Sequence, residues 1–358
     1  MSEILFLIGA GASKDSGAPT MDEFLDEAYG LNTSGKAGEH KSDFDSVFNA
    51  ISELQAVYSK SQLDLDNLES VFAAFEMGRI INKLPGFTLE QIENLLKSIR
   101  WVIFKTIEQT MKFPVQDKQV RPSKSYNYLA NLIIKLNDQG RKKRCSVITF
   151  NYDLGLDYAL HFNSRPAEYF LKEDIKQSNT PLLKLHGSLN WIKCPECNNV
   201  FAWEFVTFFQ KYSYRFLEDV QFVIIDLASK LQESNIEHCS KKIIDPTPFI
   251  VPPTWNKSAQ QQDLLKVWSQ AAIELSDAEN IFISGYSLTE TDAFFRYLFA
   301  LGSIGKKRIK RIWVFDPDKN DVVYKRFNEL IGTGARPRFR FEKATFFELL
   351  QEVDRLSL

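Results

Sequence analysis

The chain contains short, continuous apolar runs that are separated for the most part by segments with a helical hydrophobic pattern. Runs of this kind are typical of strands buried on both faces, because neither face of such a strand contacts water. Strands that alternate with helices predict a parallel sheet with helices on both faces, a Rossmann-like α/β fold. The predicted strands are residues 4–8, 146–150, 182–185, 249–251, 281–283 and 312–315.

One long segment interrupts this alternation. Across residues 31–120, apolar side chains such as Phe44 and Ile51 recur at helical spacing, and we find no convincing strand. A chain of 358 residues is long enough for two hydrophobic cores. We therefore expect a main domain at residues 1–30 and 121–358, a helical insertion at 31–120, and a small helical module at 190–247.

Composition and charge exclude several classes of protein. Hydrophobic residues make up 44% and charged residues 25% of the chain, which is an ordinary balance for a globular protein. The formal net charge of -2 provides no general attraction to nucleic acid or anionic membranes, so we expect no direct nucleic-acid binding. No apolar run approaches the roughly 20 residues that span a bilayer, and no secretory signal is recognisable. We expect a cytoplasmic protein that makes no membrane contact.

A glycine-containing loop, Gly-Ala-Gly-Ala-Ser at residues 9–13, directly follows the first predicted strand, and we expect a helix from Pro19 and Thr20 onward. Glycines let a backbone approach phosphate oxygens, and a helix start offers unpaired N–H groups and the positive end of a dipole. The loop is a candidate diphosphate site, although such a turn can also be purely structural. Lys14 stands where a dehydrogenase fingerprint has its third glycine, and the Gly-Lys-Ser/Thr sequence of phosphate-loop NTPases is absent.

Two further polar motifs follow predicted strands. Asn151 and Asp153 come directly after the strand at residues 146–150, and His186 follows the strand at 182–185. Because the carboxyl ends of parallel strands meet at one edge of a sheet, we expect these side chains to lie near the glycine loop. A helix cap formed by Asn or Asp, and a lone structural histidine, are the alternative interpretations.

Five motifs together resemble the sirtuin family, the silent information regulator proteins. The resemblance spans roughly residues 4 to 320, and the order of five motifs is far more specific than any one of them. The chain looks closer to a divergent bacterial branch of NAD hydrolases used in antiphage defence than to the protein deacylases. The motifs are residues 9–13 with 17–19, residues 149–153, residues 186–187, residues 194–197 and residues 285–288.

The resemblance implies that the main domain is a sirtuin-like catalytic domain that binds NAD, and it assigns roles to particular residues. The diphosphate would be lined by Gly9, Ala10, Gly11 and Ser13, with Gly285 and Ser287 closing over the phosphates. The nicotinamide ribose would be surrounded by Asn151 and Asp153, with His186 as the catalytic base. The adenosine ribose would meet Asp316, where sirtuins often carry an asparagine.

The chain also departs from the sirtuin pattern. Sirtuins carry an aromatic and a basic residue after Gly-Ile-Pro-Asp, whereas residues 17–24 read Gly-Ala-Pro-Thr-Met-Asp-Glu-Phe, so the lid over nicotinamide must be built differently. Deacylases pair an acyl-lysine peptide with a segment that here reads Phe-Ile-Val-Pro-Pro-Thr-Trp, at residues 249–255. Pro252 and Pro253 supply no N–H donors, which counts against peptide docking.

The chain's four cysteines are too few for a disulfide scaffold, so a joint role for them would be metal binding. Sirtuins hold structural zinc with two Cys-x-x-Cys pairs, whereas here Cys194 and Cys197 form the only one. Cys239, with His238 beside it, would complete a degenerate zinc-ribbon module. Adjacent ligands are geometrically awkward, and Ile236 stands where a fourth cysteine would belong. The alternative is a loop whose cysteine pair has lost its metal.

Cleavage of NAD needs few catalytic groups. Nicotinamide leaves as a neutral ring, so breaking its bond to the ribose requires no general acid. Through its resemblance to sirtuins, the chain would use Asn151 to orient a water or a ribose hydroxyl, His186 to take its proton, and Asp153 to fix the ribose or the amide. In a hydrolase water reaches the ribosyl carbon, whereas in a deacylase an acyl oxygen does.

The leading hypothesis is an NAD hydrolase that releases nicotinamide and ADP-ribose and acts in antiphage defence by depleting NAD. Unregulated hydrolysis would harm the cell, so we expect activation by a partner or by assembly. The resemblance implies a homo-oligomer that works beside a hexameric HerA-like ATPase. The alternatives are an NAD-dependent deacylase and a sensor that binds NAD or ADP-ribose without turnover.

Overall fold

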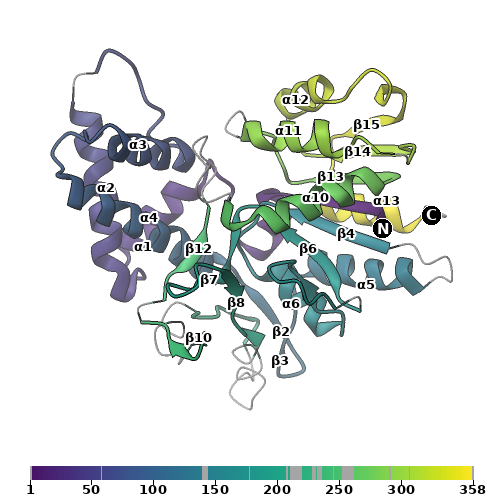
Figure 1. Cartoon of the computed structure of the whole chain (residues 1–358), viewed down its shortest axis with the longest axis horizontal. Coiled ribbons are helices and arrows are strands. Elements are labelled where there is room, and N and C mark those ends of the chain that lie inside the picture. Colours follow the sequence, from purple (N-terminus) through teal and green to yellow (C-terminus); the bar gives the residue numbers. More distant parts are fainter. Residues whose placement is uncertain are drawn as a thin grey trace.

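A seven-stranded sheet forms the centre of the main body in the computed structural model, which describes residues 2–57, 59–138, 144–176, 178–206, 209, 220–227, 231, 236–244, 246–251, 262–289, 292–305 and 307–356. The strand order is β15-β14-β13-β1-β4-β6-β5, and every neighbouring pair is parallel (Figure 1). The strands are β1 (Ser2–Ile8), β4 (Arg144–Thr149), β5 (Ala167–Glu168), β6 (Thr180–Lys184), β13 (Asn280–Ser284), β14 (Arg311–Phe315) and β15 (Phe339–Glu342).

The parallel sheet confirms the predicted α/β fold class, and five of the predicted strands belong to it. The run at residues 249–251 was assigned wrongly to this sheet. It forms β12 (Pro248–Ile250), which pairs antiparallel with β7 (Gly187–Lys193) in a separate sheet that also holds β8 (Val200–Ala202). An apolar run shows that a strand is buried, but it does not specify the sheet that the strand joins.

Helices cover both faces of the large sheet, as predicted. Successive residues of β1 point to opposite sides, so Leu5 and Leu7 enter one hydrophobic core while Ile4 and Phe6 enter the other. The core that contains Leu5 and Leu7 also contains α10 (Leu265–Asp277), α11 (Ala293–Gly302) and α12 (Val322–Leu330). The core that contains Ile4 and Phe6 also contains α5 (Lys124–Asp138), α6 (Gly155–Phe162) and α13 (Phe346–Asp354).

In the described residues no helix has the length and apolar character needed to cross a membrane.

A third core belongs to the helices drawn on the left of Figure 1. They are α1 (Phe24–Thr33), α2 (Lys41–Ala56), α3 (Leu68–Ile80) and α4 (Leu89–Thr110). Asn67 caps α3, and Thr88 and Gln91 form a capping box at the start of α4. The same core includes Leu189 and Ile192 of β7, so these helices pack against the small sheet.

Two expectations for this segment were wrong in detail. The helix expected from Pro19 and Thr20 begins at Phe24. Before it, the glycine loop continues directly into a 3-10 helix (Ala10–Ser16), which ends at Gly17 in left-handed backbone with a φ of +88°. The segment expected to contain no strand ends in β2 (Phe113–Gln116) and β3 (Gln119–Val120), a hairpin whose turn uses left-handed backbone at Asp117 and Lys118. The domain boundaries at residues 30 and 120 remain predictions.

The order in which strands are added reverses at β1. From β1 the chain builds β4 and β6 on one side, and later returns to build β13, β14 and β15 on the other. The loops after β1 and β13 therefore turn toward opposite faces of the sheet. In open α/β sheets, ligands bind at the carboxyl end of the strands at such a reversal.

Candidate active site

A cavity of about 780 Å³ lies at the carboxyl edge of the sheet. This volume is in the usual range for sites that bind small molecules and cofactors. Side chains from the helical segment, Leu68 and Glu69 of α3 and Ile107 of α4, form part of its wall. It is also lined by every non-metal residue that the sequence predicts for the site, namely Gly9, Ala10, Gly11, Ser13, Asn151, Asp153, His186, Gly285, Ser287 and Asp316.

The loops after β1 and β13 contact each other backbone to backbone. The Gly9 N–H donates to Ser284 O at 3.2 Å, and the Gly11 N–H donates to Gly285 O at 2.9 Å. A Cβ atom at Gly9 would lie 2.5 Å from Gly285 O, and Gly285 itself has a φ of +65°. The backbone N–H groups of Gly9 and Gly11 thus already have partners within the protein, and binding of a diphosphate at this loop stays a prediction. The absent side chains of these glycines let the two loops touch.

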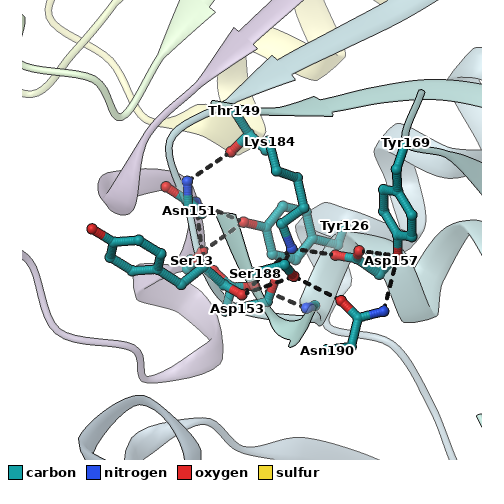
Figure 2. Close-up of polar contacts among 12 residues, drawn as sticks. Ser13, Tyr126, Thr149, Asn151, Asp153, Asp157, Tyr169, Lys184, Ser188 and Asn190 are labelled. Atoms are coloured by element: carbon teal, nitrogen blue, oxygen red, sulfur yellow. Dashed lines mark hydrogen bonds and ion pairs between the residues drawn. The ribbon is translucent and has the colours of Figure 1, made fainter. Parts of the chain in front are cut away.

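Ser13 and Asn151 are the centre of a buried polar network (Figure 2). The Asn151 Nδ2 group donates to Gly9 O at 2.9 Å and to Ser13 Oγ at 3.0 Å. Tyr126 OH lies 2.6 Å from Ser13 Oγ and 3.2 Å from Asn151 Nδ2. These acceptors fix the orientation of the amide, because only its NH₂ group can donate to them. The Asn151 Oδ1 atom is thereby left to accept a hydrogen bond from a water or a hydroxyl in the cavity.

Asp153 is a further member of this network. Ser13 Oγ donates to Asp153 Oδ2 at 2.6 Å, and the Gly155 N–H donates to Oδ1 at 2.8 Å. Burial raises the pKa of Asp153, while nearby Lys184 acts to lower it. In this structure Asp153 holds Ser13 and the start of α6. Its expected contact with a ribose stays a prediction.

Lys184 supports the site from beneath the cavity, and sequence reasoning missed it. It is 1% exposed, and its Nζ donates to Asp153 O at 2.6 Å and to Asp157 Oδ2 at 3.0 Å. The other carboxylate oxygen of Asp157, Oδ1, accepts a hydrogen bond from Tyr169 OH at 2.5 Å. The available signal was a lysine inside an otherwise apolar predicted strand. Tyr126, in contrast, gave no signal, because it is one aromatic residue on an ordinary amphipathic helix.

His186 is buried beside a carboxylate that was also not predicted. Its Nε2 lies 3.5 Å from Oδ1 of Asp292, which immediately precedes α11. The His186 ring is 5.0 Å from that of Phe150 and 6.2 Å from that of Tyr152, measured between centroids. His186 is therefore enclosed by two aromatic rings and a carboxylate at the cavity wall.

Asp316 and Ser287 lie where β14 and β13 lead into the cavity. The backbone carbonyl of Ser287 accepts a hydrogen bond from Arg326 at 3.2 Å, and the Asp316 N–H donates to Glu342 O at 3.1 Å. Burial raises the pKa of the Asp316 side chain to about 6. The carboxyl group of Asp316 therefore loses its negative charge as the pH falls below about 6.

A second cluster, separate from the cavity, brings together Cys194, Cys197, His238 and Cys239. Their ligand atoms all lie within 4.8 Å of one another. His238 Nδ1 is 3.6 Å from Cys197 Sγ and 3.3 Å from Cys239 Sγ. Tetrahedral zinc, with Zn–S distances of about 2.3 Å and Zn–N distances of about 2.0 Å, would place its ligands roughly 3.5 to 3.8 Å apart. The four side chains fit a structural zinc ion, which would crosslink the loop at Cys194 to the hairpin at His238.

The expected obstacle to this site was wrong, since the adjacent residues His238 and Cys239 can both face one point. His238 ends the strand β10 (Glu237–His238), and its ring stacks on Phe201 with centroids 4.4 Å apart. Cys239 then has a left-handed φ of 53°, which turns its Sγ back toward the histidine ring. Backbone N–H groups of Cys197 and Glu196 lower the pKa of Cys194 to about 7, which favours the thiolate form that binds metal.

We predict that replacing Lys184 by Met destabilises the protein by about 3 to 5 kcal/mol, because Asp157 would remain buried without its cation. Urea unfolding measures the change. As the control, Lys41→Met breaks an ion pair with Asp45 in which both side chains are more than half exposed, and it should leave the unfolding midpoint nearly unchanged. Equal costs for the two variants would contradict a structural role for the buried ammonium.

We predict that the purified protein retains about one zinc ion per chain after dialysis. Cys197→Ser and His238→Ala should lower the zinc content, because each removes one ligand of the cluster. Elemental mass spectrometry measures the metal. Cys145→Ala is the control, since Cys145 is buried in β4 outside the cluster. If both ligand variants hold as much zinc as the wild type and the control, the metal site is refuted.

Comparison of the sequence with protein-family models and with curated proteins finds no match. Among solved structures, the chain is similar to a Sir2 homologue in complex with NAD, with a TM-score of 0.44 and 16% identity over 99% of this chain and 89% of that one. A mutant Sir2 homologue in complex with ADP-ribose gives 0.43 and 16%, over 99% and 91%. Sir2Tm bound to a propionylated peptide gives 0.39 and 15%, over 98% and 91%. At these values the likeness bears on neither the reaction nor the substrate of this chain.

Proposed function

We propose that the protein is an NAD hydrolase that releases nicotinamide and ADP-ribose. The observation that carries this proposal is the gathering of Asn151 and His186 in one cavity with the two glycine loops. These residues are distant in sequence, yet they line a space large enough for a dinucleotide. Such an arrangement supports binding of the diphosphate at the loops and of the nicotinamide ribose between Asn151 and His186.

The orientation of Asn151 supports the proposed mechanism. Its NH₂ group is held by Gly9 O and Ser13 Oγ, so Oδ1 can accept a hydrogen bond from a water beside the ribose. His186 takes a proton from that water while the bond between nicotinamide and the ribosyl carbon breaks. Nicotinamide carries off the bonding electron pair as a neutral molecule, and the water oxygen bonds to the oxocarbenium-like carbon.

Backbone pairing near β12 favours hydrolysis over deacylation. The Val251 N–H donates to His186 O at 2.8 Å, and Tyr152 OH donates to Val251 O at 3.1 Å. The N–H of Val251 is thus already used within the protein and cannot donate to a substrate peptide, and its carbonyl already accepts one hydrogen bond. Residues 252–255, which include the two prolines of the sequence prediction, lie outside the described residues.

We propose that the protein acts in antiphage defence. An enzyme of this kind would deplete NAD in antiphage defence, in the manner of abortive infection, and it would need a control that keeps it inactive at rest. We propose that activation comes from homo-oligomer assembly or from a HerA-like ATPase partner in the cytoplasm. Purification with and without such a partner, followed by measurement of mass in solution, tests this arrangement.

We predict that the protein cleaves NAD without any acylated peptide, alone or after addition of proteins encoded beside it. His186→Ala and Asn151→Ala should each lower the rate at least about 100-fold, because they remove the base and the group that orients water. Chromatography of nicotinamide and ADP-ribose measures the rate. His161→Ala is the matched control, since His161 lies at the end of α6 and does not line the cavity.

Other outcomes of the same assay identify the competing functions. Nicotinamide release that occurs only with an acylated peptide would indicate a deacylase. Calorimetric binding of ADP-ribose, with no product under any condition, would indicate a sensor. Full turnover by both variants, with unchanged unfolding temperatures, would mean that the assigned base and amide are wrong.

We predict that affinity for ADP-ribose, which contains the adenosine ribose but cannot lose nicotinamide, falls as the pH drops below about 6. Ionised Asp316 accepts hydrogen bonds from ribose hydroxyls better than the protonated acid does, and its pKa is raised to about 6. Binding is therefore strongest above this pKa and weakens toward tenfold per pH unit below it. Calorimetry between about pH 5 and 7.5 measures the effect. Asp316→Asn should remove the pH dependence, and an unchanged profile in this variant would contradict the assignment.

A further inference from the structure

Asp292 and His186 form a buried pair of ionisable side chains at the cavity wall. His186 Nε2 lies 3.5 Å from Asp292 Oδ1, and the two side chains are only 4% and 5% exposed. A carboxylate loses much hydration free energy on burial and therefore needs a cation or hydrogen-bond donors nearby. The contact between these two side chains thus affects the charge state and orientation of each.

Asp292 is anchored by a second group as well. Tyr286 OH donates to Asp292 Oδ2 at 2.9 Å, so each carboxylate oxygen has a different partner. The Tyr286 ring stacks on Phe150, with centroids 4.1 Å apart and planes inclined by 8°. Tyr286 directly follows Gly285, whose backbone contacts the first glycine loop. The carboxylate is consequently held in place relative to both the imidazole and the loops that form the cavity.

The geometry of this pair determines which ring nitrogen of His186 can act as a base. A neutral imidazole has one N–H donor and one nitrogen with a lone pair. An ionised carboxylate can only accept hydrogen bonds, so beside ionised Asp292 a neutral ring would carry its proton on Nε2, the nitrogen that faces the carboxylate. The lone pair would then be on Nδ1.

We propose that Asp292 is a positioning residue that selects the Nε2–H tautomer of His186 and stabilises the imidazolium formed during the reaction. This inference rests on the proposed function, because it takes His186 as the base. The proton moves from the attacking water or ribose hydroxyl to Nδ1, and the electron pair of the broken O–H bond stays on the oxygen that attacks the ribosyl carbon. Asp292 itself gains no proton.

The kinetic test uses Asp292→Asn, whose amide can donate to Nε2 and so reverse the tautomer. We expect kcat for NAD cleavage to fall about 100-fold, whereas affinity for ADP-ribose should change by no more than about twofold. Asp292→Glu should recover part of kcat because it restores the charge. Asp43→Asn is the matched control. Asp43 lies 3.0 Å from His40 Nδ1 in the helical segment, outside the cavity, and its replacement should leave both quantities unchanged.

A second test examines the resting protein and needs no turnover. Nitrogen NMR distinguishes a protonated ring nitrogen from a bare one, and the signals of His186, one of four histidines, are identified by their loss in His186→Gln. At a pH where the ring is neutral, we expect the proton on Nε2 in the wild type and on Nδ1 in Asp292→Asn. A proton on Nδ1 in the wild type, or no change in the variant, would overturn the proposal.

The two tests separate failure of this inference from failure of the proposed function. A wild-type protein that never cleaves NAD refutes the hydrolase, while the nitrogen spectrum still decides the tautomer. If the wild type cleaves NAD and Asp292→Asn keeps its kcat, only the positioning role is refuted. A joint loss of kcat and ADP-ribose affinity with an unchanged tautomer would make Asp292 structural, which also overturns the proposal.

Discussion

The close approach of the loops after β1 and β13 is the constraint on which the site depends. These strands are neighbours at the point where the sheet reverses its order, and their loops share backbone hydrogen bonds through Gly9, Gly11 and Gly285. Any side chain at Gly9 or Gly285 would overlap backbone atoms of the other loop. Because the N–H groups of Gly9 and Gly11 donate to the other loop, the loops are rigid, and these two amides cannot donate to a phosphate. A diphosphate bound here would therefore contact loops whose conformation is already fixed.

Beneath the cavity, a chain of buried polar side chains is connected by hydrogen bonds and makes this layer rigid as well. Asn151 is held by Ser13, Ser13 by Asp153, and the backbone of Asp153 by Lys184. Each member has partners within hydrogen-bond distance, and a fully satisfied network of this kind restricts its side chains to one arrangement. The ammonium group of Lys184 lies near two buried carboxylates, those of Asp153 and Asp157. The charge balance beneath the site thus depends on Lys184.

The sequence was sufficient where burial alone determines structure, as in the apolar strands at the centre of the sheet and the polar residues directly after them. It was insufficient for β15 (Phe339–Glu342), whose half-buried Arg340 and Glu342 interrupt the apolar pattern of an edge strand. It placed the polar motifs at one edge of the sheet, but it could not identify the individual side-chain contacts between distant segments. Tyr126 reaches Ser13 across 113 residues. The convergence of His238 and Cys239 depends on a left-handed backbone angle that adjacency in sequence does not reveal.

The helical segment has a direct physical connection to the cavity. Leu68, Glu69 and Ile107 line the wall, and the hydrophobic core of α1 to α4 includes Tyr152, the residue that follows Asn151. Displacement of α3 or α4 would change the shape of the cavity and the charge facing it without any rearrangement of the sheet. Because protein cores are closely packed, such a displacement would also act on Tyr152. Activation by a partner or by assembly, as proposed, would therefore need only a contact with these helices to reach the residue beside Asn151.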